Sequence, residues 1–166
     1  MEKVTTIFLD VDGTMTDGNI YLDNQKNELK SFNVKDGLLI AALIRAGYQV
    51  LIMTGRESQV VARRAAELGI TACYQGIKDK RFLLEKLMKK NNFTYQNLAY
   101  LGDDLNDLSV MKQVAFAGCP ADAVPEIKAV ADYISEFRGG RGAVRDILSY
   151  LLKEQGEYEQ IINQYS

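Results

Sequence analysis

Residues 4–14 read Val-Thr-Thr-Ile-Phe-Leu-Asp-Val-Asp-Gly-Thr. The apolar and β-branched run predicts a short buried strand over residues 4–10, and Gly13 indicates the turn that follows it. Asp10 and Asp12 therefore lie at the carboxyl end of the first strand. Ligands bind outside the carboxyl ends of parallel strands, so these carboxylates are candidates for a site if the rest of the chain builds such a sheet.

Strand-like and helix-like segments alternate along the rest of the chain, which is typical of an α/β fold with a parallel sheet. Further strands are predicted over residues 48–53, 70–74, 97–101, 114–117 and 132–134, and helices over 36–46, 57–68, 78–90, 105–112, 121–131 and 143–153. In the last but one of these helices, Pro125 is tolerable only in the first turn. We predict a single domain over residues 1–166 with a Rossmann-like, three-layer α/β sandwich.

Residues 18–34 interrupt this alternation. Short apolar runs flank the polar segment Asp23-Asn-Gln-Lys-Asn27, which predicts a β-hairpin inserted after the first strand. An isolated hairpin is marginally stable, so we expect it to pack on its own domain or on another subunit. The tail, residues 138–166, begins with a Gly-rich segment, and the sequence assigns no role to residues 154–166.

The composition excludes several kinds of function. The chain has 166 residues, with 20 Lys and Arg against 22 Asp and Glu. It has no His, so histidine-based catalytic triads and zinc sites with histidine ligands are excluded. The pI near 5.3 argues against a nucleic-acid partner. No apolar run approaches the ~18 residues of a membrane span, and the amino terminus does not resemble a signal peptide. Cys73 and Cys119 are expected to be buried free thiols, which favours a reducing cytoplasm.

Polar side chains gather at the carboxyl ends of the predicted strands. They are Asp10, Asp12 and Thr14 after the first strand, Thr54, Gly55 and Arg56 after the second, Asp103, Asp104, Asn106 and Asp107 after the fourth, and Lys80 at the start of the helix after the third. Neighbouring carboxylates require a neutralising cation, and oxygen ligands without His or Cys suit Mg²⁺.

The same set of groups suggests a reaction. Asp10 can act as a nucleophile towards phosphorus, and Asp12, facing the same site, can protonate a leaving alkoxide and then activate water. Thr54 can donate to a phosphate oxygen, and Lys80 supplies a positive charge.

Four ordered motifs resemble those of the haloacid dehalogenase superfamily of phosphatases. They are Asp10-Val-Asp12-Gly-Thr14, Thr54-Gly55, Lys80 and Gly102-Asp103-Asp104-Leu-Asn106-Asp107, and the match spans residues 10–107. The resemblance implies that Asp10 is the nucleophile and a Mg²⁺ ligand, and that Asp12 is the acid/base and binds the metal through its backbone carbonyl. It implies further that Thr54 binds phosphate, that Lys80 stabilises the phosphorylated intermediate, and that Asp103 is a metal ligand. Asp104 and Asp107 would hold metal waters and Lys80.

A narrower resemblance covers residues 3–153. The absence of a cap domain, the hairpin, Thr54-Gly55-Arg56 and the segment Arg138-Gly-Gly-Arg-Gly-Ala-Val-Arg145 resemble the capless, tetrameric subfamily that hydrolyses 2-keto-3-deoxy sugar acid phosphates. This resemblance implies a homotetramer, a product used in lipopolysaccharide synthesis, and 3-deoxy-D-manno-octulosonate 8-phosphate as the substrate. The implied substrate-binding residues are Thr14, Gly55, Arg56, Arg64, Arg138, Gly139 and Gly140.

Several alternatives stay open at this point. The substrate could be a nine-carbon keto-sugar acid 9-phosphate, or the chain could be a non-catalytic module related to sugar-acid cytidylyltransferases. A phospho-acceptor signalling domain fits less well, because its acceptor Asp follows the third strand. Taken singly, Lys80 could begin a solvated helix beside Lys78, Thr54-Gly55 could cap a helix, and Arg64 could serve a subunit contact.

Overall fold

The computed structural model describes residues 3–70, 72–91 and 93–166, and its centre is a six-stranded sheet. The strands are β1 (Thr6–Leu9), β4 (Gln49–Met53), β5 (Ala72–Tyr74), β6 (Leu98–Leu101), β7 (Phe116–Cys119) and β8 (Tyr133–Ile134), in the spatial order β5-β4-β1-β6-β7-β8. All neighbours are parallel, and Phe8 of β1 lies opposite Leu51 of β4 and Tyr100 of β6. The central strands are apolar on both faces because helices cover both faces.

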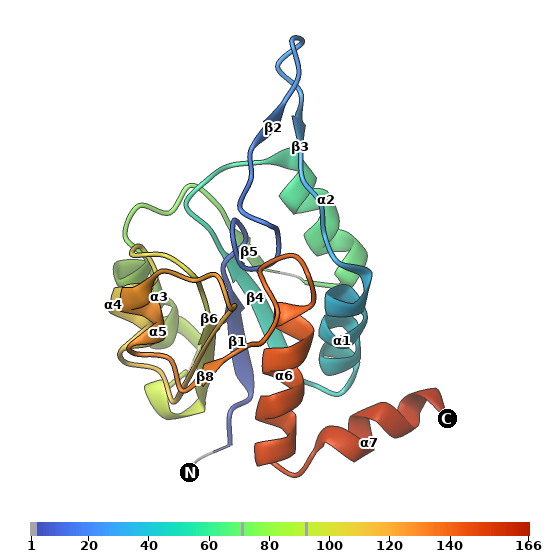
Figure 1. Ribbon diagram of the computed structural model, residues 1–166. Helices are drawn as coiled ribbons and strands as arrows, with labels where there is room; N and C mark the ends of the chain where they lie inside the picture. The colour runs from blue at the N-terminus through green and yellow to red at the C-terminus, as the bar shows by residue number, and fades with distance from the viewer. Residues whose placement is uncertain (1–2, 71, 92) are drawn as a thin grey trace.

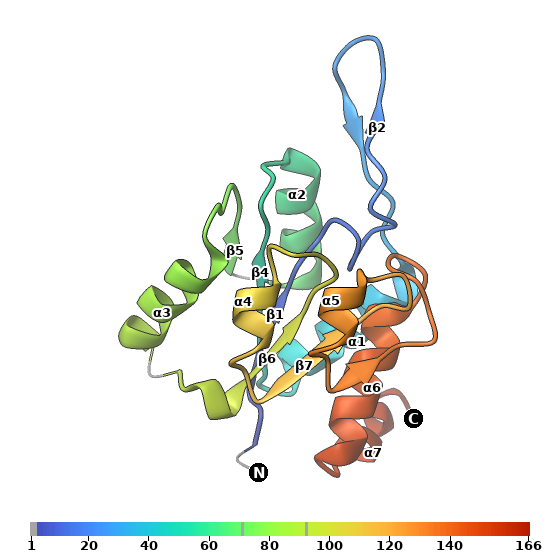
Figure 2. The same cartoon turned by 60° about the vertical axis from the view of Figure 1, so that its left-hand side comes forward.

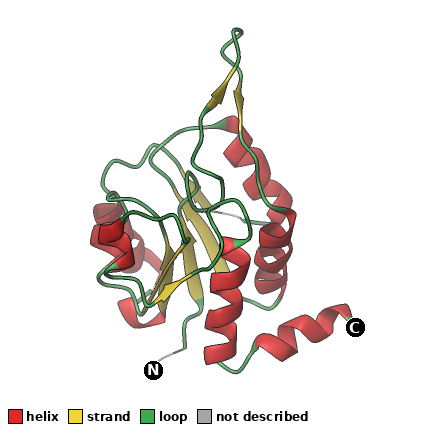
Figure 3. Cartoon of the chain, viewed as in Figure 1, coloured by secondary structure: helices red, strands yellow, loops and turns green. Residues whose placement is uncertain are grey.

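Helices form the two outer layers, as Figures 1 and 3 show. One face carries α1 (Val34–Arg45), α2 (Gln59–Leu68) and α6 (Ala143–Glu154), and the other carries α3 (Lys80–Asn91), α4 (Leu108–Met111) and α5 (Pro125–Lys128). Each face has its own apolar cluster, with Ile40 and Ile147 on the first and Leu84 and Ile127 on the second. The predicted fold class, a three-layer α/β sandwich on a parallel sheet, is confirmed.

The predicted hairpin is also present. Strands β2 (Tyr21–Leu22) and β3 (Glu28–Leu29) pair antiparallel and project beyond the rest of the molecule (Figures 1 and 2). Apolar side chains on it are exposed, among them Leu22 at 68% and Leu29 at 64%. The hairpin therefore leaves an apolar surface uncovered in the single chain.

Some predicted boundaries were wrong. Helix α4 begins at Leu108 instead of residue 105, because residues 103–107 form a turn around the side chain of Asp107. Helix α5 begins at Pro125 instead of residue 121, with the proline at the start of the helix, where its missing N–H is not needed. Strand β7 is Phe116–Cys119 and not residues 114–117, and its register places Phe116 opposite Ala99.

The tail completes the core at the amino-terminal edge of the sheet. After α6 comes α7 (Tyr158–Ile162), which is followed by the short 3-10 helix η2 (Asn163–Tyr165). A second short 3-10 helix, η1 (Tyr95–Asn97), lies directly before β6. Ile161 is buried in the apolar cluster under α1, and Tyr165 contacts Arg45. Residues 154–166 thus have a packing role that their sequence did not reveal.

Two further expectations concern cysteines and membrane spans. Cys119 is buried as expected, whereas Cys73 is only partly buried, and both are free thiols. Among the described residues, no helix combines the length and apolarity that crossing a bilayer would require.

Candidate active site

The site lies at the carboxyl end of β1. Strand order reverses at this strand, because the chain continues to β4 on one side and later to β6 on the other. Loops after these three strands therefore converge on one crevice. The backbone N–H of Asp10 donates to the carbonyl of Leu101 at 2.9 Å. The loop after β1, residues 10–17, therefore begins against the end of β6; we call it the nucleophile loop after the role predicted for Asp10.

Lys80 joins two carboxylates from different strands. Its Nζ lies 2.6 Å from Oδ1 of Asp10 and 2.6 Å from Oδ1 of Asp107, and its side chain is 0% exposed. A buried ammonium requires such partners. The interpretation of Lys80 as a solvated helix start is therefore wrong, whereas Lys78 is exposed.

Asp107 is an anchor for the surrounding turn. Its Oδ1 accepts from the hydroxyl of Tyr100 at 2.6 Å as well as from Lys80, and its Oδ2 accepts from the backbone N–H groups of Asp103 at 3.0 Å and Asp104 at 3.3 Å. Sequence reasoning missed Tyr100. The available signal was a tyrosine inside a buried strand, because a buried tyrosine hydroxyl usually has a hydrogen-bond partner.

Asp103 contacts the nucleophile loop at Gly13 and Thr14. Its Oδ1 accepts from the hydroxyl of Thr14 at 2.9 Å. A Cβ added at Gly13 would lie 2.0 Å from Oδ2 of Asp103, and Gly13 has a φ of +97°. Only glycine combines this backbone conformation with so close an approach.

The acidic residues are close enough to repel one another. One carboxylate oxygen from each of Asp10, Asp103 and Asp107 lies within 4.8 Å of the others. Burial, with the charge of Asp107, raises the pKa of Asp10 to about 7 despite the opposing effect of Lys80. Burial, with the charge of Asp10, raises the pKa of Asp103 to about 8. A divalent cation would relieve this repulsion, and carboxylate oxygens are its preferred ligands, so these residues fit Mg²⁺.

Asp12 faces the base of the hairpin. Its carboxylate pairs with Nζ of Lys30, which also lies 3.0 Å from Oε1 of Glu28. Glu28 in turn pairs with Arg56 at 3.5 Å. Sequence reasoning missed Lys30 and Glu28, because the polar residues of the hairpin carried no pattern that pointed to the site.

The Gly-rich segment of the tail packs on the nucleophile loop. The N–H of Gly140 donates to the carbonyl of Thr14 at 3.2 Å, and the N–H of Gly139 donates to Oδ1 of Asp122 at 3.0 Å. A Cβ at Gly139 would lie 1.8 Å from the carbonyl oxygen of Gly13. Gly139 and Gly140 are thus brought to the site, beside the exposed Arg138.

Comparisons with known proteins agree with this geometry. Residues 74–148 match the model of the haloacid dehalogenase-like hydrolase family. The 3-deoxy-D-manno-octulosonate 8-phosphate phosphatase of Escherichia coli strain K12 is 42% identical over 159 residues, which cover 96% of this chain and 85% of that protein. The chain belongs to the haloacid dehalogenase-like hydrolases.

Solved structures are similar over almost the whole hydrolase. The crystal structure of 3-deoxy-D-manno-octulosonate 8-phosphate phosphatase from Moraxella catarrhalis, in complex with magnesium, phosphate and KDO, superimposes with a TM-score of 0.94. It is 38% identical, with 98% of this chain and 94% of that chain covered. The cobalt-bound deoxy-D-mannose-octulosonate 8-phosphate phosphatase from Haemophilus influenzae has a TM-score of 0.88 at 36% identity, covering 95% and 92% of the two chains.

Three other residues predicted for the site, Thr54, Gly55 and Asp104, lie in different surroundings. Thr54 is buried at the end of β4, and Gly55 follows it beside the side chain of Asn106. Helix α2 begins at Gln59 with Ser58 before it, so the expectation that Thr54-Gly55 caps this helix is wrong. Asp104 is exposed, and its carboxylate accepts from the N–H of Leu105 at 2.7 Å.

Arg64 is held away from the acidic residues. Its guanidinium lies over the ring of Phe32 at 5.8 Å and pairs with Glu67 at 3.2 Å, and a Cβ at Gly37 would lie 2.3 Å from it. These contacts place it between α1 and α2 and not with Asp10. A role at a subunit contact stays a prediction.

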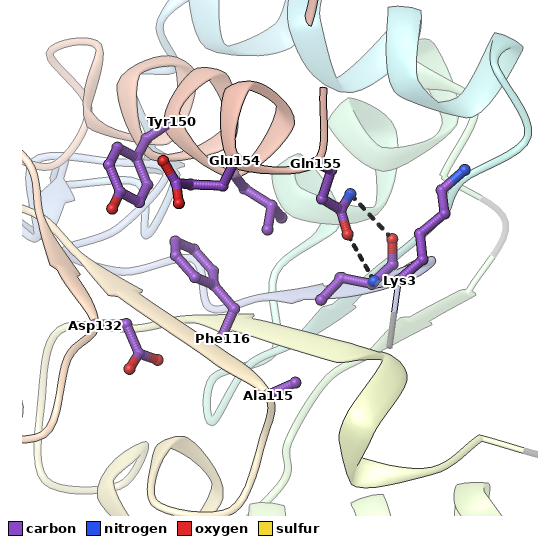
Figure 4. Close-up of a pocket in the computed structure, with 9 residues that line it drawn as sticks. Lys3, Ala115, Phe116, Asp132, Tyr150, Glu154 and Gln155 are labelled. Carbon is purple, nitrogen blue, oxygen red and sulfur yellow. Dashed lines mark hydrogen bonds between the residues drawn. The ribbon is translucent and has the colours of Figure 1, made fainter. Parts of the chain in front are cut away.

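A cavity of about 450 Å³ lies at the other end of the sheet (Figure 4). Its lining includes Phe116 at the start of β7 and Tyr150 and Glu154 of α6. Gln155 closes one side, because its amide accepts from the N–H of Val4 at 2.6 Å and donates to its carbonyl at 3.3 Å. Since these residues surround the amino ends of the strands, the cavity is separate from the site at Asp10.

Proposed function

We propose that this hydrolase is a Mg²⁺-dependent phosphatase that acts on 3-deoxy-D-manno-octulosonate 8-phosphate. The observation that supports this choice of substrate is the 42% identity to the Escherichia coli phosphatase over 96% of the chain. The chemistry is supported by the site itself, in which buried Lys80 holds Asp10 beside Asp103. The nine-carbon alternative is not favoured, because the Escherichia coli relative is a phosphatase of the eight-carbon sugar acid phosphate.

The proposed reaction has two halves. Asp10 attacks phosphorus, its carboxylate oxygen forms a bond to phosphorus, and the bond from phosphorus to the sugar oxygen breaks. Asp12 gives its proton to that oxygen. Water then attacks the phosphorus of the aspartyl phosphate, Asp12 takes a proton from the water, and inorganic phosphate leaves with Asp10 regenerated.

The other residues bind and stabilise. Lys80 offsets the negative charge at Asp10, and the hydroxyl of Thr54 binds phosphate. Mg²⁺, held by Asp10, Asp103 and the backbone carbonyl of Asp12, would neutralise charge on the phosphoryl oxygens. The segment at Gly139 and Gly140 covers the substrate, and the exposed guanidinium groups nearby attract its anionic groups. The proposed substrate-binding set is Thr14, Gly55, Arg56, Arg138, Gly139 and Gly140, with Arg64 acting from a subunit contact.

We further propose a cytoplasmic homotetramer whose product enters lipopolysaccharide synthesis. The exposed apolar side chains of the hairpin support an assembly, because large apolar surfaces of this kind mark interaction sites. The two free thiols are compatible with a reducing compartment.

A phosphate-release screen tests the proposal. Eight- and nine-carbon keto-sugar acid phosphates are compared with hexose phosphates, each with Mg²⁺ and with a chelator. We expect the highest kcat/KM on the eight-carbon phosphate and loss of release with the chelator. Equal turnover of hexose phosphates would contradict the substrate, and no Mg²⁺-dependent release from any phosphate would favour the non-catalytic module.

A further inference from the structure

The side chain of Lys30 is unusual for its position. It comes from the projecting hairpin, where Tyr21, Leu22 and Leu29 are exposed at 43%, 68% and 64%. The side chain of Lys30 is nevertheless only 1% exposed. It therefore turns back from the hairpin into the molecule and ends at Asp12.

Charged partners fix the ammonium group there. Lys30 pairs with Asp12 of the nucleophile loop and, at 3.0 Å, with Glu28 of its own hairpin. Glu28 also pairs with Arg56, which follows β4. Burying an ammonium group is costly without such partners, so this alternating row of charges links the hairpin to two strand ends.

We propose that Lys30 is a positioning residue that holds the carboxylate of Asp12 for proton transfer, so that the hairpin is part of the catalytic apparatus. The proposal rests on the proposed function, in which Asp12 donates a proton to the leaving oxygen. Asp12 lies two residues after Asp10 on the same loop, and its side chain is 21% exposed, so the loop alone does not hold it in place. The ion pair with the buried ammonium group of Lys30 restricts rotation of this side chain and keeps Asp12 in one orientation. A proton donor outside hydrogen-bond reach of its acceptor loses its effect on the rate.

Leaving groups that differ in their need for a proton test this role. An alkoxide needs protonation as it leaves, whereas p-nitrophenolate does not. We would measure kcat/KM, which reports the steps up to release of the leaving group, on the sugar acid phosphate, on glucose 6-phosphate and on p-nitrophenyl phosphate. Glucose 6-phosphate is included because it is an alkyl phosphate without a carboxylate.

The variant Lys30→Met is compared with Lys30→Arg and with the control Lys35→Met, which changes an exposed lysine at the start of α1. We expect Lys30→Met to lower kcat/KM about tenfold or more on both alkyl phosphates and by less than about twofold on p-nitrophenyl phosphate, since general acid catalysis contributes roughly 10²–10⁴-fold. Lys30→Arg should restore part of the loss, and Lys35→Met should match the wild type.

Two results would overturn the proposal. An equal loss on all three substrates would show a merely structural effect, and a loss confined to the sugar acid phosphate would show that Lys30 binds the carboxylate of the substrate. If Lys30→Met does not fold, Glu28→Gln, which removes one of the charges that hold Lys30, should give a smaller loss with the same dependence on the leaving group. If Glu28→Gln showed no such leaving-group-dependent loss, that result would count equally against the proposal.

A double variant separates this inference from the proposed function. If Lys30 acts through Asp12, Lys30→Met should have no further effect on alkyl phosphates in an Asp12→Asn background, and an additive loss would contradict the proposal. Should the wild type hydrolyse glucose 6-phosphate and p-nitrophenyl phosphate but not the sugar acid phosphate, the proposed substrate fails. Comparison of the two hydrolysed phosphates would still test Lys30.

Discussion

Lys80 shows how a single residue organises this site. Its ammonium group is shared by Asp10, which follows β1, and Asp107, which follows β6, at 2.6 Å each. The hydroxyl of Tyr100 donates a hydrogen bond to the second of these carboxylates, that of Asp107, at 2.6 Å. Small changes at these residues should therefore affect rate and stability in separable ways.

At Asp10 we expect the change Asp10→Asn to lower kcat by about three orders of magnitude or more, as when a catalytic nucleophile is removed. The amide oxygen can still accept from Lys80, and one charge is removed from a repelling group. The folded state should therefore be retained with an equal or higher Tm. Phosphate release and thermal unfolding measure the two effects, and appreciable residual turnover in a clean preparation would refute the nucleophile assignment.

At Tyr100 the change Tyr100→Phe removes one donor to Asp107 and leaves the ring. We expect the free energy of unfolding to fall by about 1.5–3 kcal/mol, the range for a hydrogen bond to a charged group. We also expect kcat to fall more than KM changes, because Lys80 is less firmly placed against Asp10. Denaturant unfolding and steady-state kinetics check this, with Tyr95→Phe as the control. Unchanged kcat would show that Asp107 does not depend on Tyr100.

At the scale of elements, the contact between the tail segment and the nucleophile loop depends on a missing side chain. A Cβ at Gly139 would overlap the carbonyl oxygen of Gly13. Gly139→Ala should therefore displace the segment, raise KM severalfold and lower Tm. Gly156→Ala is the control, because its Cβ meets no atom within 4 Å and it tests only the cost of a φ of +70°. An unchanged KM in Gly139→Ala would contradict a role for this segment in substrate binding.

Another contact between elements carries a pH dependence. Asp36 of α1 is 3% exposed, and its Oδ1 accepts from the N–H of Arg145 in the first turn of α6 at 2.8 Å. Its other oxygen is buried and has no hydrogen-bond partner among the residues that the structure describes. Burial raises the pKa of Asp36 to about 6, although the N–H of Arg145 opposes this. The folded protein therefore holds this proton more tightly than the unfolded chain, whose ordinary pKa is 3.8.

The sign of the effect follows from linkage. The stability that protonated Asp36 contributes is fully present below about pH 4 and is lost as the pH rises through about 6. Asp36→Asn does not titrate, so the difference in unfolding free energy between Asp36→Asn and the wild type should grow in favour of the variant across this window. Denaturant unfolding at a series of pH values measures it, and a constant difference would contradict the assignment.

At the scale of the whole molecule, the hairpin offers an exposed apolar surface to a partner. Its exposed apolar residues, and a site open at one edge of the sheet, lead us to expect a homotetramer. Light scattering at micromolar concentration should give about four times the chain mass of 18.6 kDa. Replacing Leu22 and Leu29 by Ser should shift the mass towards the monomer. A monomeric mass for the wild type would refute the expected assembly.

Local patterns in the sequence predicted the architecture and the order of the motifs. Alternating strand and helix signals predicted the parallel sheet, and polar residues at the strand ends predicted which loops meet, because a parallel sheet brings its carboxyl ends together. Boundaries in 103–107 and 121–124 were missed because turns around buried side chains carry no periodic signal. The catalytic and substrate-binding roles remain predictions for the experiments above.

The sequence by itself determined that Asp10, Thr54, Lys80 and Asp103 lie at one rim of a parallel sheet, since each belongs to a motif readable within a few residues. Only the tertiary structure decided which charges pair there. Lys30 with Asp12, Tyr100 with Asp107 and Asp36 with Arg145 join different segments, the last across 109 residues. Periodicity encodes which face of an element is buried, but the partner met on that face depends on how separate elements pack.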